Sequence, residues 1–273
     1  HTMLMTDGFT DQHPMMADKL AHLGYETSGG SEDKSAQKMW NDINEKVGTL
    51  TEGLLTGTSE KYKPLATLYA TLSTNPPATE DEAMYATLTD TTAALAVAHI
   101  GHWMVNDFVD TTNNQVKEDN RAKYAGLIAE VFLSAFTNSK DIDFSEPTLT
   151  ALGKLTTARN LTEKLKEATK ILHAAWVQLN KTFKPEHLQR FADKFKKSVR
   201  AYETKINLQL TKNLTLEGYL ANRKDSAGCS PYFELKYYIS GELMGISRDD
   251  TFKFIEKHKS SLDDLAEKVD AFI

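Results

Sequence analysis

Acidic and amide side chains gather at residues 106–110, directly after a long apolar stretch. Asn106 and Asp110 are four residues apart, so on a helix they share a face, and Asp107 lies beside them. Mg²⁺ is a hard ion that usually takes one or two carboxylates together with substrate phosphates. The spacing therefore predicts a magnesium site at these three residues. The polar C-terminal end of an ordinary helix would give the same pattern, and spacing alone leaves both interpretations open.

A second segment that could bind a ligand contains Arg223, followed by the turn-forming run Ser226-Ala-Gly-Cys-Ser-Pro231. Arginine presents a permanently charged fork that suits phosphate groups, and a break between two helices exposes backbone amides that a continuous helix would hide. The segment therefore predicts a phosphate-binding arginine at a helix break. A helix cap at Gly228, with a new helix starting at Pro231, would also explain the break, but it would not explain Arg223.

The elements that must position these residues are helices. No alternating strand pattern of useful length occurs, and apolar residues recur at helical spacing over about 34–55, 62–72, 80–112, 117–137, 147–157, 161–180, 185–211, 215–223, 231–241, 248–258 and 260–273. The helix over 80–112 is nearly apolar from Ala93 to Val105 and should therefore be central. We predict an all-α, single-domain bundle of about ten helices.

Composition limits the possible partners and the domain organisation. The 273 residues carry a net charge of −6, which argues against a nucleic-acid partner. The single cysteine excludes an internal disulfide and any multi-cysteine metal site, and it fits a reducing, cytoplasmic location. No apolar run is long enough to span a bilayer. We expect residues 1–35 to be a flexible segment that begins with a remnant of an expression tag, and 36–273 to be the helical domain.

Taken together, the two motifs resemble those of the class I terpene synthases of the microbial type. Asn106-Asp-Phe-Val-Asp110 is similar to their aspartate-rich motif, Asp-Asp-x-x-Asp/Glu. Arg223 falls at the place of the arginine that senses the substrate diphosphate at a helix break. The resemblance covers roughly residues 80–273 and implies the isoprenoid synthase fold.

The resemblance also implies an activity and a set of site residues. It implies Mg²⁺-dependent ionisation of farnesyl or geranylgeranyl diphosphate and cyclisation to a terpene, with three Mg²⁺ ions beside the diphosphate. The family often forms homodimers, so a homodimer is also expected. It assigns Asn106, Asp107 and Asp110 to the metal and Arg223 to the diphosphate. Ser226 and Ala227 would lie in the break that helps to trigger departure of the diphosphate. Four aromatic residues beside the two motifs are the candidates for lining the cavity, namely Trp103, Phe108, Tyr232 and Phe233.

Two departures from the family pattern keep other functions open. Asn106 stands where the family has aspartate, and nothing after Arg223 fits the family's second metal motif, Asn-Asp-x-x-Ser-x-x-x-Glu. We expect the chain to stop short of that motif. One alternative is a chain-elongating prenyltransferase, which would carry two aspartate-rich motifs. The other is a non-catalytic helical protein that kept the fold. His99 and His102 could suit a metal, but hydrogen-bonded core histidines explain them more simply.

Overall fold

Every regular element of the described residues is a helix. The computed structural model describes residues 34–74, 81–112, 115–156, 160–210, 215–226 and 228–272. Two short 3₁₀ helices, η3 (Gly57–Lys61) and η5 (Glu118–Asn120), accompany eleven α-helices: α2 (Lys34–Leu50), α3 (Tyr62–Thr74), α4 (Glu82–Thr112), α5 (Arg121–Leu133), α6 (Glu146–Leu155), α7 (Leu161–Thr182), α8 (Pro185–Leu210), α9 (Leu216–Ser226), α10 (Ser230–Leu243), α11 (Arg248–Lys257) and α12 (Lys259–Phe272). The predicted all-α class is confirmed.

The predicted division of the chain into two parts stays a prediction. The N-terminal segment lies outside the described residues as far as residue 33, and so does Ala227 in the helix break. No helix in the described ranges combines the length and the apolar character that a membrane crossing requires.

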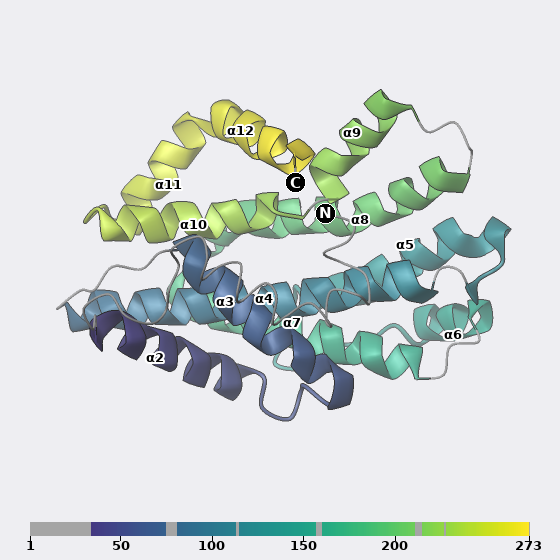
Figure 1. Cartoon of the computed structure of the whole chain (residues 1–273), viewed down its shortest axis with the longest axis horizontal. Coiled ribbons are helices and arrows are strands. Elements are labelled where there is room, and N and C mark those ends of the chain that lie inside the picture. Colours follow the sequence, from purple (N-terminus) through teal and green to yellow (C-terminus); the bar gives the residue numbers. More distant parts are fainter. Residues whose placement is uncertain are drawn as a thin grey trace, which may run out of the picture.

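Helix α4 lies at the centre of the bundle, as its apolar sequence predicts. Residues 93–98 are fully buried, so this part of the helix has no solvent-facing side. Helix α7 packs along α4, with α2 and α3 on one side of the pair and α8 and α10 on the other (Figure 1). The two central helices approach closely at Gly101, where a Cβ atom would lie only 3.0 Å from the Ala168 carbonyl oxygen. A larger side chain at Gly101 would push α7 away.

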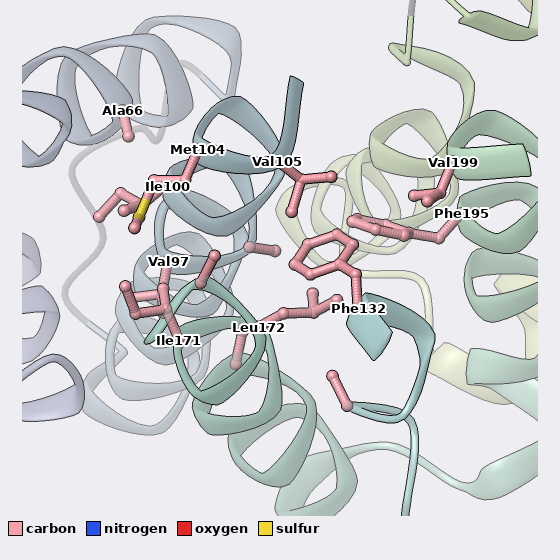
Figure 2. Close-up of a cluster of buried hydrophobic side chains, with 14 of the residues drawn as sticks. Ala66, Val97, Ile100, Met104, Val105, Phe132, Ile171, Leu172, Phe195 and Val199 are labelled. Atoms are coloured by element: carbon pink, nitrogen blue, oxygen red, sulfur yellow. The ribbon is translucent and has the colours of Figure 1, made fainter. Parts of the chain in front are cut away.

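The hydrophobic core joins the central helices to their neighbours. Figure 2 shows buried side chains of α4, α5, α7 and α8 meeting around the C-terminal half of α4. The rings of Phe132 and Phe195 lie 5.8 Å apart at a tilt, an arrangement that aromatic pairs prefer. The labelled members of this cluster are Ala66, Val97, Ile100, Met104, Val105, Phe132, Ile171, Leu172, Phe195 and Val199. This packing fixes the end of α4 that carries the acidic residues.

Local sequence signals set the start of the helices that flank the site. The Ser145 hydroxyl accepts a hydrogen bond from the Thr148 amide and caps α6, and the Ser247 hydroxyl caps α11 in the same way through Asp250. Serine at the N-cap satisfies an amide that the helix leaves unpaired. Both helix starts lie within two residues of the predicted boundaries.

A buried charge network joins α8, α10 and α12. The Arg190 guanidinium donates to both oxygens of Glu234 and to Asp263, at 2.8–3.0 Å. The Lys194 ammonium lies 2.6 Å from Glu234 and 2.8 Å from Asp263. Glu234 is only 1% exposed, so its charge depends on these two partners. The network holds α10 and α12 in place against α8.

Replacement of Glu234 should therefore be strongly destabilising. In the Glu234→Ala variant, two partly buried cations keep only Asp263 as a partner, and breaking a buried ion pair in this way costs about 3–5 kcal/mol. The free energy of unfolding measured in urea should fall by that amount. Asp264→Ala, which removes an exposed ion pair with Lys268, is the control and should cost less than about 1 kcal/mol. Equal losses in the two variants would contradict a structural role for the network.

Candidate active site

The acidic end of α4 brings two of the three predicted metal ligands, Asn106 and Asp110, into contact. The Asn106 amide donates to Asp110 Oδ2 at 3.5 Å, which confirms that these two residues share a face of the helix. Asp110 Oδ1 accepts a hydrogen bond from Lys205 Nζ on α8 at 3.0 Å, and Asp107 accepts one from the Tyr62 hydroxyl on α3. The two carboxylates are thus positioned by helices on both sides of α4.

The predicted break between two helices is present. Helix α9 ends at Ser226 and α10 begins at Ser230, with Gly228 at φ +77° between them. Helix α9 is held against α8 by the Asn222 amide, which donates to the Ala201 carbonyl at 3.1 Å, and by an ion pair of 2.7 Å between Lys197 and Asp225. The orientation of α9 therefore comes from α8.

Arg223 is a half-buried cation in the last turn of α9. Within the described ranges it has no ion pair or hydrogen bond with another side chain. A guanidinium that is partly removed from water normally gains a carboxylate or a phosphate partner. Its position leaves it available to an anion that enters the site.

The far side of the break is tied to the C-terminal end of α12. Asp270 is fully buried and accepts hydrogen bonds from the amides of Cys229 and Ser230, both at 3.1 Å, and from the Ser230 hydroxyl. This end of α12 lies beside the adjoining ends of α9 and α10 (Figure 1). Asp270 therefore supplies the cap that the first turn of α10 lacks locally.

Tyr202 on α8 connects the acidic residues with Arg223. Burial raises the pKa of the Tyr202 hydroxyl, and the negative charge of Asp110 adds to the rise. The positive charge of Arg223 opposes that rise, and Asp107 adds to it. A single hydroxyl is thus close enough to respond to both carboxylates and to the guanidinium. The two predicted motifs, far apart in the sequence, thus both contribute charge that acts on the Tyr202 hydroxyl.

His102 on α4 forms hydrogen bonds with two tyrosines, Tyr202 on α8 and Tyr232 on α10. Its Nε2 lies 2.8 Å from the Tyr202 hydroxyl and its Nδ1 lies 3.0 Å from the Tyr232 hydroxyl. Burial lowers the pKa of His102 to about 4, so the ring is neutral at pH 7, with one nitrogen donating and the other accepting. His102 is a fully hydrogen-bonded core histidine, as the simpler interpretation of the sequence predicted.

Three of the four predicted cavity aromatics meet in what we call the aromatic cluster. His99 stacks on Tyr232 with ring centres 3.5 Å apart and lies 5.6 Å from Trp103. Lys236 Nζ lies over the faces of Phe233 and Tyr69, at 5.2 and 5.7 Å. The cluster consists of Tyr69 from α3, His99 and Trp103 from α4, and Tyr232, Phe233 and Lys236 from α10. The fourth candidate, Phe108, is half-buried and packs against the hydrophobic core.

Several residues of the site were not found from the sequence. Lys205 and Tyr202 lie three residues apart on α8 and so share a face, but helical spacing does not say which neighbour that face meets. Lys236 carried a usable signal, because it is a lysine within an otherwise mostly apolar and aromatic run. Asp270 and Tyr69 carried none, since their roles depend on contacts with elements distant in the sequence.

The donor set fits a magnesium ion that is shared with a substrate. In the part of the chain that the structure describes, no group of three or more His, Cys, Asp or Glu side chains could hold a metal ion. Two carboxylates and one amide on α4 remain, which is too few for a cage built only of protein. Mg²⁺ commonly takes one or two carboxylates and completes its octahedron with water and phosphate oxygens. The residues at the end of α4 suit that arrangement.

A sequence comparison supports the same family. Residues 146–252 match the family model described as terpene synthase family 2, C-terminal metal binding. The resemblance to the terpene synthases is confirmed. The terpene synthase match begins at α6, includes Arg223 and the whole break, and ends within α11, while the acidic residues of α4 precede it. No curated protein and no solved structure matches this chain.

Substitution of Gly228 should destabilise the protein, because the break leaves no room for a side chain there. A Cβ atom at this position would lie 2.4 Å from His102 Cε1, and φ is in the left-handed region. Gly228→Ala combines a backbone penalty of about 1–2 kcal/mol with overpacking of about 1–3 kcal/mol. The free energy of unfolding should fall by their sum, and the shift should be visible by chemical denaturation.

Gly245→Ala is the matched control for this substitution. Gly245 has φ +71°, but a Cβ atom there meets nothing within 4 Å. It should lose only the backbone part, about 1–2 kcal/mol. If the free energy of unfolding fell equally in both variants, the contact between the break and His102 would not limit the size of the side chain at Gly228.

Proposed function

We propose that this chain is a terpene synthase that ionises an isoprenyl diphosphate of the farnesyl or geranylgeranyl class and cyclises it. The observation that carries the proposal is Arg223, which is half-buried at the helix break and has no ion pair or side-chain hydrogen bond among the described residues. Its charge and those of the α4 carboxylates both act on the Tyr202 hydroxyl. A diphosphate between these two groups would meet a cation on one side and metal-binding carboxylates on the other. The terpene synthase match over 146–252 supports the same reaction.

Different side chains bind the diphosphate and the metal ions in this proposal. Arg223 binds the diphosphate by charge-assisted hydrogen bonds, which are strong and directional. Asn106, Asp107 and Asp110 hold the magnesium ions, of which we propose three. Bound Mg²⁺ supplies positive charge that stabilises the leaving diphosphate.

The helix break and the aromatic cluster complete the proposed mechanism. By their place in the sequence, Ser226 and Ala227 would belong to the break that helps to trigger departure of the diphosphate. The ring faces of Trp103, Tyr232 and Phe233 stabilise the allylic cation, by roughly 0.5–2 kcal/mol for each face that it meets. Cyclisation at such a surface also needs the exclusion of water.

Binding of magnesium and diphosphate can be tested without turnover. Inorganic diphosphate and Mg²⁺ together should raise the melting temperature by roughly 5–10 °C at a hundredfold excess over Kd, because ligand binding to the folded state stabilises it by about 2.7 kcal/mol. Either component alone should give a smaller shift. Asp110→Ala and Arg223→Ala should each abolish most of the combined shift, measured by differential scanning calorimetry.

Turnover is tested by incubating the full-length protein with farnesyl and geranylgeranyl diphosphate and Mg²⁺, with volatile products identified by mass spectrometry. We expect a terpene hydrocarbon or alcohol whose yield falls at least about a hundredfold in Arg223→Ala and Asp110→Ala, a loss typical of removing a group that stabilises developing charge. The matched controls, Arg200→Ala and Asp264→Ala, change exposed residues and should keep full activity.

The outcome also distinguishes the alternatives. A lengthened isoprenyl diphosphate, formed when isopentenyl diphosphate is added, would indicate a prenyltransferase. The absence of any product from a folded protein would favour the non-catalytic helical protein. The cytoplasmic location and the homodimer stay predictions, the latter testable by light scattering.

A further inference from the structure

Lys236 is a cation that the terpene synthase mechanism above does not use. It lies on α10, half-buried, less than two helical turns beyond the break. Among the described residues it has no ion pair and no hydrogen bond, and its ammonium lies over the rings of Tyr69 and Phe233. Burial lowers the pKa of Lys236. A lysine held away from water without a carboxylate is unusual, because the charged form loses hydration.

The positive charges of Lys236 and Arg223 both act on Cys229, a residue of the break. Burial raises the pKa of the Cys229 thiol to about 12, and the charge of Asp270 adds to the rise. The positive charges of Lys236 and Arg223 both oppose it. Cys229 is the last residue of the break, directly before the first residue of α10. Arg223 of α9 and Lys236 of α10, neither of which has an ion pair among the described residues, therefore flank the break, three residues before α9 ends and six residues after α10 begins.

This part of the structure already binds one anionic group. The Asp270 carboxylate accepts hydrogen bonds from the backbone amides of Cys229 and Ser230 at 3.1 Å each. These two amides are taken by Asp270, while neither Arg223 nor Lys236 has a carboxylate partner of its own among the described residues. An entering anion with more than one negative charge would be favoured there.

A second polar group beside Lys236 also lacks a partner. His99 is 4% exposed, and its Nε2 has no hydrogen bond within the described ranges. Burial lowers the pKa of His99, and the charge of Lys236 lowers it further. The Lys236 ammonium and the His99 ring thus lie close together in the aromatic cluster. Tyr69, another member of this cluster, interacts with Cys229 in the break.

We propose that Lys236 is a second diphosphate-binding residue, which holds the substrate anion together with Arg223 from the other side of the α9–α10 break. This inference rests on the proposed function. When the ammonium turns toward the diphosphate, it leaves the faces of Tyr69 and Phe233. Those faces then become available to the isoprenoid chain, so binding of the anion and exposure of the aromatic surface are coupled.

The experiment measures the binding of inorganic diphosphate with Mg²⁺ by isothermal titration calorimetry. The variants are Lys236→Met, Arg223→Ala and, as a matched control, Lys268→Met, which changes an exposed lysine paired with Asp264. Lys236→Met should weaken diphosphate binding by about 10- to 100-fold, the loss expected for one charge-assisted hydrogen bond. Lys236→Arg should keep most of the affinity, and Lys268→Met should bind like the unmodified protein.

The outcomes separate this inference from the proposed function. If Arg223→Ala weakens binding and Lys236→Met does not, the role of Lys236 is wrong and the proposed function stands. If the unmodified protein does not bind diphosphate with Mg²⁺, both are wrong. Melting temperatures without ligand check the fold of each variant, and Lys236→Gln replaces Lys236→Met if the latter does not fold. A loss of affinity in the Lys268→Met control as large as that in Lys236→Met would also overturn the assignment.

Discussion

The close approach of the α9–α10 break to His102 is the contact on which the rest of the site depends. Gly228 leaves no room for a side chain above the imidazole ring. The same ring holds the hydroxyls of Tyr202 and Tyr232 through its two nitrogens. One buried histidine on α4 therefore sets the distance from α4 to α8, to α10 and to the break between α9 and α10.

The partly buried cations of this fold differ in whether they have a carboxylate partner. Arg190 and Lys194 are partly buried, and both are neutralised by Glu234 and Asp263, as a buried charge requires. Arg223 and Lys236 are also partly buried, yet neither has a carboxylate partner within the described residues. The fold thus neutralises the cations that join helices and leaves two cations near the break without internal partners.

Much of the fold could be predicted from the sequence because the helices carry strong local signals. The apolar stretch from Ala93 to Val105 predicted the central helix, and the Gly228 and Pro231 pair predicted the break. The candidate site was predicted less completely. Asn106 and Asp110 share a face because of helical periodicity alone. The partners of these residues, such as Lys205 on α8, come from other helices, and no spacing within one helix encodes them.

The sequence by itself determined the helical class, the helix boundaries to within a few residues, the acidic end of α4 and the arginine before the break. These features depend on periodicity, capping and turn chemistry, which act over a few residues. The packing of whole helices was needed to show that His102 binds Tyr202 and Tyr232, that Asp270 caps α10 and that Lys236 lies over two aromatic rings without an ion pair among the described residues. Such contacts depend on how whole helices pack, because burial and charge pairing are set by neighbours that are distant along the chain.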